Sequence, residues 1–454
     1  MRLHTRFGVS VCLTIFLIVS IILLLPSARI ATHLHKFPFG DSLNNYRNGI
    51  WKGWGSPEDD EVEGGVRIVV FGDSWVDDAV EEGETGRGRS WVDVVCEEVS
   101  SGIQIQDTML TDQLNCTSQL NFAASQPSKA YPAAPPTGAI TSNYIYLTAV
   151  NVSNPEHVAS TMLPDLATQI EEYIELPSST KVKTTVFVVS FGFWDIYQYA
   201  SLDFKFAQDI TDTTVTELFA QLDILHSHYA KQLSSGLPEE EAPEIPADTG
   251  NSTEETEIVH RPLFRVIIPK LFDPTLLPGW ISQRPIPLRP SSVAEEQKNA
   301  VYLTNKWNIL LENKIREWVK AAPPSNPEQL WDTYDPESSA AADLEKDVFY
   351  YDLPSYLLDV IVEHHLEDED ISDATGLGTG DSPFGNVSES CVSVGITMGE
   401  ERNGKAVCKE AKEYLWWDAF NLGGVANEFV GKAVGQMMKE GKGVRGDDDS
   451  GWLW

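Results

Sequence analysis

The feature that most constrains this fold is an apolar run at residues 66–71 that ends in the turn Gly72-Asp73-Ser74. Every residue of the run except Arg67 is apolar, which predicts a parallel strand buried on both faces. Gly72 interrupts the strand, so Ser74 is expected at the carboxyl edge of a sheet, where open α/β folds bind ligands. A serine hydroxyl in that place is a nucleophile if a base reaches it.

Strands and helices are expected to alternate along the rest of the chain. Further strands are predicted at residues 182–190, 264–269 and 348–351, with a short apolar run at 120–125. Helices are predicted at residues 90–99, 163–174, 218–233, 293–320, 356–365 and 423–438, and loops at 127–143 and 366–390. Such alternation indicates parallel βαβ units. Four or five strands fit a flavodoxin-like three-layer α/β/α sandwich with a parallel sheet.

The N-terminus carries an apolar segment at residues 7–25, which contains no charged residue and follows Arg2 and Arg6. That length spans a bilayer, which favours a signal-anchor of a single-pass type II membrane protein in the secretory pathway. A cleaved signal, giving a secreted protein, is the alternative. The predicted organisation is a cytoplasmic tail (1–6), the anchor (7–25), a stalk (26–64), one domain (65–440) with an acidic insertion (235–260), and an acidic tail (441–454).

Glycosylation sequons and cysteines agree with a lumenal or extracellular body. The acceptor asparagines of the sequons are Asn115, Asn151, Asn251 and Asn386. Outside the apolar segment the cysteines are Cys96, Cys116, Cys391 and Cys408, which permit three disulfide connectivities. We expect the local pairs Cys96–Cys116 and Cys391–Cys408, the second of which would brace the loop before Asp418.

The formal net charge of −35 argues against nucleic acid and anionic membrane surfaces as partners. No metal site is predicted, because His226 and His228 are two apart on a helix and therefore face apart. No cofactor is predicted either. The glycines at 376, 378 and 380 lack the preceding strand and following helix of a phosphate-binding loop.

Four short blocks follow one another along the chain. They lie at residues 72–74, 121–126, 192–195 and 416–422 and read GDS, NFAASQ, GFWD and WWDAFNL. Together they resemble the motifs of the GDSL, or SGNH, ester hydrolases, and they extend the resemblance over roughly residues 66–435. The resemblance implies the flavodoxin-like sandwich, with Ser74 as nucleophile and Asp418 as the acid of a triad.

Three positions depart from the family pattern. Gln126 replaces a glycine whose backbone N–H binds the oxyanion, and Trp194 replaces the asparagine that is another oxyanion donor. The indole N–H of Trp194 substitutes only if it points inward, and we expect it mainly to pack the pocket wall. Asn421 stands where the family has its histidine, and an amide cannot accept the serine proton.

The resemblance also assigns roles to neighbouring residues. The Ser74 N–H is a further oxyanion donor, and Asp73, Gly192 and Asp195 are expected to support the site. Asn421 is expected to lie near Ser74 and to hydrogen-bond its hydroxyl. If another histidine acts as base, His364 or His365 is the first choice, although both fit a solvated helix end.

Two functions therefore remain open from the sequence. The first is a serine hydrolase acting weakly on acyl or acetyl esters of lipids or glycans. The second is a catalytically impaired relative that binds an acyl or carbohydrate ligand without turnover. Both take a small-molecule, lipid or glycan ester as the partner, with the membrane contacted through the N-terminal helix.

Overall fold

The computed structural model describes residues 65–77, 87–100, 116–125, 138–159, 162–177, 184–236, 263–287, 291–321, 344–368, 382–394 and 405–446. No helix within these ranges is long and apolar enough to cross a membrane. The predicted anchor at 7–25 and stalk at 26–64 lie outside them, as does most of the predicted acidic insertion.

The centre of the molecule is a parallel sheet in the order β2-β1-β3-β4-β5, which is the flavodoxin-like order. Its strands are β1 (Val66–Gly72), β2 (Cys116–Asn121), β3 (Thr184–Ser190), β4 (Leu263–Pro269) and β5 (Glu345–Tyr351). All seven residues of β1 are buried, as its apolar run predicts. The strand that follows β1 in the chain, β2, pairs with one side of β1, and β3 pairs with its other side, so the strand order switches at β1. Ser74 directly follows β1 at this switch point.

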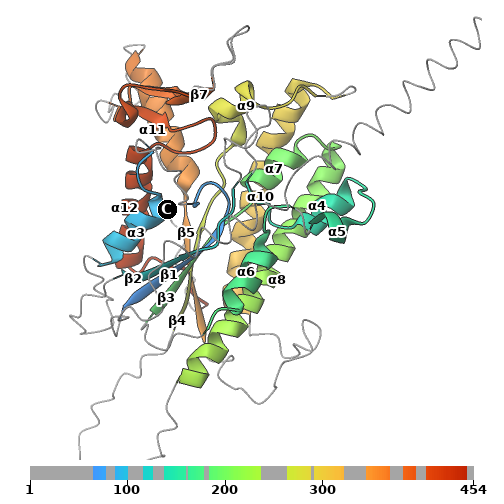
Figure 1. Ribbon diagram of the computed structural model, residues 1–454, viewed down its shortest axis with the longest axis vertical. Coiled ribbons are helices and arrows are strands. Elements are labelled where there is room, and N and C mark those ends of the chain that lie inside the picture. The colour runs from blue at the N-terminus through green and yellow to red at the C-terminus, as the bar shows by residue number, and fades with distance from the viewer. Residues whose placement is uncertain are drawn as a thin grey trace, which may run out of the picture. The chain divides into compact units, whose positions relative to one another are not determined.

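Helices cover both faces of this sheet (Figure 1). On one face lie α3 (Trp91–Ser100) and α12 (Gly424–Lys439), and on the other lie α6 (Leu166–Ile174), α8 (Phe204–Gly236) and α10 (Val293–Lys320). The predicted three-layer α/β/α sandwich is therefore confirmed.

The helices α3 and α12 pack closely although they come from opposite ends of the domain. A Cβ at Gly431 would lie 2.5 Å from the Trp91 carbonyl oxygen, and one at Gly435 would lie 2.6 Å from Glu98 Cβ. Lys439 of α12 forms an ion pair with Glu98 at 2.8 Å, across 341 residues of sequence. Glycine at these positions allows the two backbones to approach.

Helix starts follow local capping chemistry. The predicted helix at 293–320 matches α10, and Ser292 Oγ accepts a hydrogen bond from the Glu295 N–H. The helix α8 begins at Phe204 and not at residue 218, so that prediction is wrong at its start. The threonines there have weak helix propensity, but Thr211 and Thr214 are buried and donate to carbonyls one turn back. Packing against the core decides the helix.

Several elements were not predicted from the sequence. They are α4 (Asn143–Ala149), α5 (Pro155–Ala159), α7 (Phe193–Tyr199), η1 (Pro274–Leu276), α9 (Pro278–Ser282), η4 (Ala411–Glu413), β6 (Asn386–Ser390), β7 (Val392–Val394), β8 (Lys405–Val407) and β9 (Tyr414–Trp416). The predicted loop at 366–390 is wrong at both ends, because α11 (Leu353–Asp368) continues into it and β6 closes it. Most of these elements are too short for a periodic signal.

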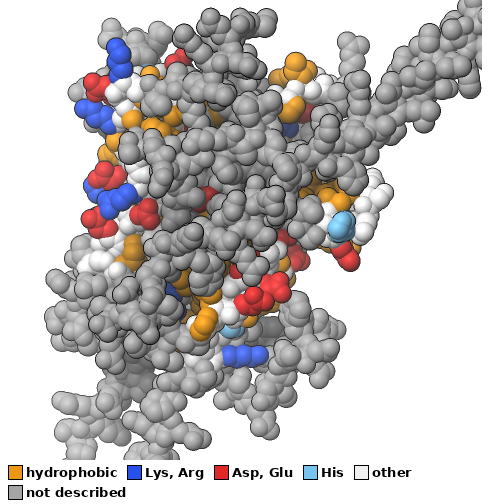
Figure 2. Space-filling view, in the orientation of Figure 1, with side chains coloured by type: hydrophobic (Ala, Val, Ile, Leu, Met, Phe, Trp, Pro, Cys, Tyr) orange, Lys and Arg blue, Asp and Glu red, His pale blue; other side chains and the backbone are white. Residues whose placement is uncertain are grey.

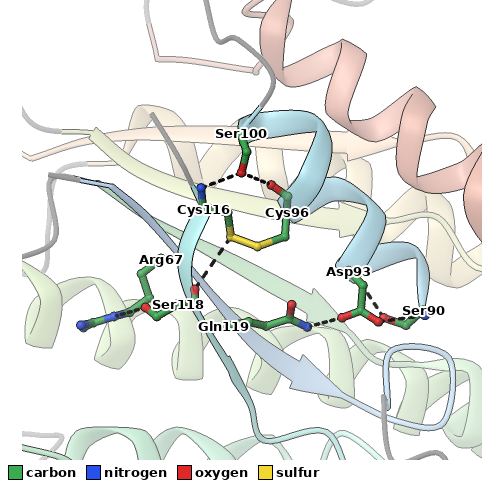
Figure 3. Close-up of a disulfide and its surroundings, with 8 residues drawn as sticks. All are labelled: Arg67, Ser90, Asp93, Cys96, Ser100, Cys116, Ser118 and Gln119. Carbon is green, nitrogen blue, oxygen red and sulfur yellow. Dashed lines mark hydrogen bonds between the residues drawn. A yellow bond between two sulfur atoms is a disulfide. The ribbon is translucent and has the colours of Figure 1, made fainter. Parts of the chain in front are cut away.

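Both expected disulfides are confirmed: Cys96–Cys116 and Cys391–Cys408. The first joins α3 to the edge strand β2 (Figure 3). Beside it, Ser100 Oγ donates to the Cys96 carbonyl at 2.8 Å and accepts from the Cys116 N–H at 2.7 Å. The second pair lies in a small β-structure next to β9, and the Cys391 N–H donates to the Trp416 carbonyl at 3.0 Å.

The folded domain extends into the predicted acidic tail. Val444 exchanges two backbone hydrogen bonds with Val348 of β5, at 3.1 and 2.8 Å, and Arg445 forms an ion pair with buried Asp347.

Of the sequon asparagines, Asn151 is exposed with a φ of 56°, and Asn386 is partly exposed. Asn115 and Asn251 lie outside the described residues.

Candidate active site

The turn that carries Ser74 begins where β1 ends. A Cβ at Gly72 would lie 2.8 Å from the Ser190 carbonyl oxygen, so only glycine fits this close approach to β3. The Asp73 carbonyl accepts from the N–H groups of Val76 and Asp77, at 3.2 and 3.1 Å. The chain therefore turns once immediately after the sheet, and Ser74 sits in that turn with only 7% of its surface exposed.

The indole of Trp194 points at this serine. Its Nε1–H donates to Ser74 Oγ at 3.2 Å, while the ring packs edge-on or tilted against Phe193, Tyr197 and Phe420. A Cβ at Gly138 would collide with the same indole edge, so the backbone there closes over the ring. Trp194 thus packs the wall, as expected, and also places a hydrogen-bond donor beside the serine oxygen.

Gly192 makes this placement of Trp194 possible. Its φ of 113° lies in the region that favours glycine, and it is the N-cap residue of α7. A Cβ there would lie 2.5 Å from the Trp307 ring. The tight turn after β3 therefore starts a helix at once, and its first turn carries Trp194 and Asp195.

The second block is attached to the same turn through its backbone. The Ala124 N–H donates to the Gly72 carbonyl at 3.1 Å, and Asn121 Nδ2 donates to the Val76 carbonyl at 3.0 Å. The Ser125 hydroxyl donates to the buried Asp77 carboxylate. Gln126, the proposed oxyanion position, lies outside the described residues.

The last block contains an acid–amide pair formed by Asp418 and Asn421. Asn421 Nδ2 lies 3.0 and 2.9 Å from the two carboxylate oxygens of Asp418. Asp418 Oδ1 also accepts from the backbone N–H groups of Phe420 and Asn421, at 2.9 and 2.8 Å. These hydrogen bonds close a turn over residues 418–421, and the Asn421 amide stands at its end.

This loop lies against the nucleophile half of the site. The ring centroids of Phe420 and Trp194 are 5.0 Å apart, and Phe420 is fully buried. Asn421, however, makes no hydrogen bond to Ser74, contrary to expectation. Its Nδ2 is committed to Asp418, and its Oδ1 is buried without a hydrogen-bond partner in the described part of the chain.

Burial changes the acidity of two site carboxylates. Desolvation raises the pKa of Asp73 well above its ordinary value. It also raises the pKa of Asp195 to about 6, against hydrogen bonds from Thr141 and Tyr199 that favour the ionised form. Asp195 holds the Thr141 backbone N–H and hydroxyl, so it fixes the segment that follows Gly138 over the site.

His226, His228, His364 and His365 do not supply a base to Ser74. His364 Nε2 bonds the Gly385 carbonyl at 3.2 Å, and its ring meets that of His365. His226 is buried and bonds the Leu344 carbonyl, and burial lowers its pKa. His228 bonds Gln232. The hydrogen bonds at Ser74 are those from Trp194 and Arg87, so a histidine partner is not present within the described ranges.

Two polar residues that support the turn were missed from the sequence. Gln169 of α6 is fully buried, and its amide bonds both the N–H and the carbonyl of Gly72, at 2.8 and 3.0 Å. A glutamine on the apolar face of an amphipathic helix was a usable signal. Arg87 Nη2 donates to the carbonyls of Ser74 and Asp77, both at 3.3 Å, and nothing in its sequence context indicates this.

A small cavity of about 20 Å³ lies beside the turn and has space for little more than ordered water. Its lining includes Asp73, Trp75, Phe193, Lys270 and Leu271. The buried Nε1 of Trp75 has no hydrogen-bond partner in the described ranges. Ser74 is not among the residues that line this cavity.

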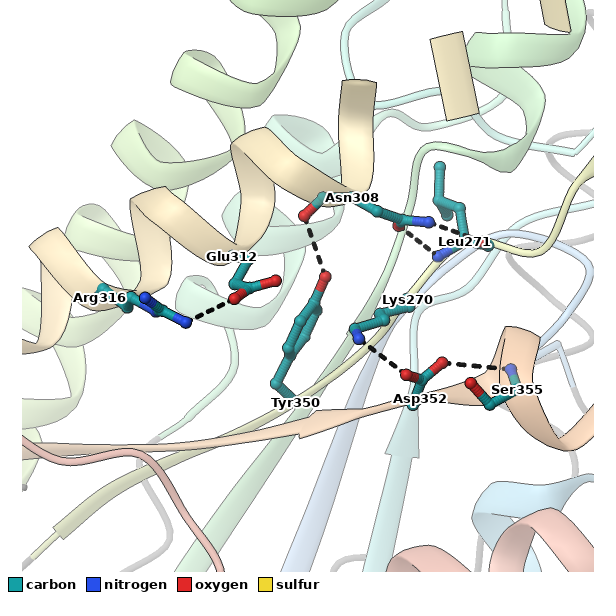
Figure 4. Close-up of polar contacts among 8 residues, drawn as sticks. All are labelled: Lys270, Leu271, Asn308, Glu312, Arg316, Tyr350, Asp352 and Ser355. Carbon is teal, nitrogen blue, oxygen red and sulfur yellow. Dashed lines mark hydrogen bonds and ion pairs between the residues drawn. The ribbon is translucent and has the colours of Figure 1, made fainter. Parts of the chain in front are cut away.

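Polar contacts fix the far wall of this cavity, where β4 and β5 end (Figure 4). Lys270 forms an ion pair with Asp352 at 2.8 Å, and the Asn308 amide bonds both the N–H and the carbonyl of Leu271, at 2.8 and 2.9 Å. Asp352 Oδ1 accepts from the Ser355 N–H. Within the described ranges, no group of three or more His, Cys, Asp or Glu side chains is arranged to hold a metal ion.

Comparisons with known proteins do not extend this picture. No protein-family model matches the chain, and no curated protein is similar to it.

Proposed function

We propose that this protein is a catalytically impaired relative of the GDSL-type ester hydrolases that binds an acyl or carbohydrate ester at the Ser74 site. The observation that carries the proposal is the hydrogen bonding of Ser74. Its hydroxyl oxygen accepts from Trp194 Nε1, and the position of the catalytic base is an amide whose N–H groups are committed to Asp418. A serine without a proton acceptor is a poor nucleophile.

Slow ester hydrolysis is the second candidate, and a specific contact favours it. The Trp194 N–H donates to Ser74 Oγ, so it lies near the carbonyl oxygen of an ester that this hydroxyl would attack, and that oxygen becomes the oxyanion. Without a base, such a site retains roughly 10³–10⁴-fold acceleration over water. Both candidates share the ligand class and differ in whether Ser74 reacts.

The test is hydrolysis of short acyl esters by the purified full chain, compared with its Asn421→His, Ser74→Ala and doubly substituted forms. A positioned base typically contributes about 10²–10⁴-fold, so Asn421→His is expected to raise the rate within that range. Ser74→Ala in the same background should abolish the gain. Circular dichroism and the unfolding midpoint of each variant check that the fold is intact.

Other outcomes count against the proposal. A fast wild-type protein that Ser74→Ala inactivates has a base elsewhere, which overturns the impaired-site assignment. A folded Asn421→His variant without any gain, together with no binding of a non-hydrolysable ester analogue in calorimetry, overturns the ester-binding assignment itself.

We also propose that the protein is a type II membrane protein of the secretory pathway, anchored by the apolar segment at residues 7–25. Two disulfides suit an oxidising compartment, and Asn151 is exposed for glycosylation. Endoglycosidase should lower the apparent mass of cell-expressed protein, and alkaline carbonate should leave it in the membrane pellet. A carbonate-soluble product would instead support a cleaved signal.

A further inference from the structure

The edge strand β5 is covered by a segment from the end of the domain. Because β5 is the last strand in the sheet order, one side of its backbone faces away from β4. On that side the Val348 N–H donates to the Val444 carbonyl at 3.1 Å, and the Val444 N–H donates to the Val348 carbonyl at 2.8 Å, in an antiparallel bridge. We refer to residues 443–446 as the strap. An uncovered strand edge is a template for pairing with another chain.

Side-chain contacts determine which segment fits this edge. Asp347 is fully buried, and its carboxylate accepts from Arg445 Nε and Nη2 at 3.2 and 3.3 Å, while Arg265 Nε lies 3.5 Å away. A Cβ at Gly443 would collide with Asp347 Oδ1. A Cβ at Gly446 would lie 2.9 Å from a backbone carbonyl oxygen of α10. The edge therefore selects the pattern Gly-x-Arg-Gly.

Charge makes the arginine of this pattern the decisive contact. When the strap leaves, the ion pair of Asp347 with Arg265 is the one that remains in the described ranges, at 3.5 Å. A buried carboxylate is costly unless cations and hydrogen bonds compensate its charge. An opened edge therefore attracts another arginine, and the strap is a segment that satisfies both glycine positions and the carboxylate.

The strap follows a hinge at the end of an anchored helix. Lys439, the last residue of α12, forms an ion pair with Glu98 of α3 at 2.8 Å. Figure 2 shows basic and acidic side chains side by side where Figure 1 draws these two helices. Gly441 comes next, with a φ of 64°, and a Cβ there would meet no atom of the described ranges within 4 Å. Rotation at Gly441 can thus lift the strap while α12 stays in place.

We propose that the strap closes the β5 edge reversibly, and that an opened edge captures the strap of a second copy of this chain. Exchange of an identical segment between two copies re-forms the bridge at Val348 and the arginine contact at Asp347. The strap therefore controls whether the protein self-associates. This contact does not involve Ser74 and holds whether or not the protein binds an ester.

Native-state hydrogen exchange on the full chain tests the opening. The Val348 and Val444 amides are expected to exchange at least about tenfold faster than the amides of β3, because a local opening suffices to expose them. Arg445→Gln should speed both amides about tenfold further, since charged hydrogen bonds are lost. The matched control is Lys442→Gln, which removes a surface ion pair with Glu440 and should leave both rates unchanged. Equal protection of these amides and of β3 in the wild type overturns reversible closure.

Complementation between two variants tests capture by a second copy. Gly443→Val keeps a sound edge but carries a strap that cannot fit, whereas Asp347→Asn keeps a sound strap but weakens the edge. Each variant alone should be a monomer in sedimentation equilibrium, and the equimolar mixture should contain a heterodimer. A fluorescein-labelled peptide of residues 440–450 should bind Gly443→Val and compete with the heterodimer.

Circular dichroism checks that both variants are folded, and a mixture of folded variants that stays monomeric overturns the capture. If either variant fails to fold, uptake of the labelled peptide by the wild type replaces the mixture. Uptake that Lys442→Gln leaves unchanged and Arg445→Gln increases supports the proposal. Absence of uptake overturns it.

Discussion

The two halves of the Ser74 site are positioned by different kinds of interaction. The nucleophile half is part of the core: Trp194 is 1% exposed and packs among aromatic rings. In the other half, Asp418 and Asn421 are only partly buried, although Phe420 between them is buried. Side-chain and backbone hydrogen bonds next to a disulfide position this pair. A position that is fixed by packing requires a side chain of the right volume. A position that is fixed by polar contacts accepts any side chain whose hydrogen-bond donor reaches the acceptor.

This difference accounts for the residue types found at positions 194 and 421. Trp194 fills its part of the core and still offers one N–H to the serine. Asn421 satisfies the Asp418 carboxylate, which is all that the loop requires of it. The loop therefore keeps its conformation without keeping a proton acceptor. Four predictions test this division, and they follow in order of expected effect.

The largest effect is expected for Trp194→Ala. Removing a fully buried tryptophan leaves a cavity and should lower the free energy of unfolding by about 3–5 kcal/mol. Trp194→Phe, which keeps most of the packing and loses the N–H, should cost about 1 kcal/mol through the hydrogen bond. Denaturant unfolding measures both. Similar losses of unfolding free energy in the two variants would mean that the hydrogen bond, and not the volume of the side chain, holds the Trp194 part of the site.

Removing the Cys391–Cys408 disulfide is expected to cost about 3 kcal/mol, since it closes a loop of 17 residues. The double replacement by serine should also speed hydrogen exchange at the Cys391 and Val392 amides, which donate to Trp416 and Trp417. The amides of β1 should change little. Equal acceleration in β1 would show that the two halves are not separately stabilised.

Asp418→Ala is expected to cost about 1–2 kcal/mol, because the amide of Asn421 and two backbone N–H groups lose a charged acceptor. Partial exposure lets water replace some of these contacts. Asp359→Ala, at an exposed position of α11, is the matched control and should be near neutral. A loss as small as that of the control would remove Asp418 as the organiser of its loop.

The smallest effect is a pH dependence in the nucleophile half. Since burial raises the pKa of Asp195 to about 6, the folded state holds its proton more tightly than the unfolded state. This stabilisation is complete below about pH 4 and is lost as the pH rises through about 6. Asp195 should account for about 1 kcal/mol of lost stability between pH 5 and pH 7.

Comparing wild type with Asp195→Asn in chemical denaturation at the two pH values isolates this contribution. The variant should show the smaller decline in stability with rising pH. Asp73, whose pKa is also raised by burial, contributes in the same direction and remains in both proteins. An identical decline in both proteins would exclude Asp195 as the titrating group.

Much of the framework could be read from the sequence because the signals were local. The apolar run of β1, the helical spacing of apolar residues at 90–99 and the spacing of the cysteines each act over a few residues. The support of the turn by Arg87 could not be read in that way, and for Gln169 the sequence signals a buried polar side chain but not its partner. That support depends on which backbone carbonyls and N–H groups the tertiary fold brings within reach.

The chemistry of the site shows the same limit. That Asn421 is not a base follows from residue type alone. Whether its amide turns to Ser74 or to Asp418 depends on competition between partners, and the charged carboxylate wins. The orientation of the Trp194 N–H was likewise decided by packing against Phe420 and by the backbone at Gly138.

The contact between α3 and α12 can form only after both helices have been synthesised. Glu98 and Lys439 are 341 residues apart, and translation at 5–20 residues per second separates their synthesis by roughly 20–70 s. During that interval the apolar side of α3 has no covering helix and stays exposed on the nascent chain. A product that ends before residue 424 lacks α12 and therefore cannot cover its sheet on that face.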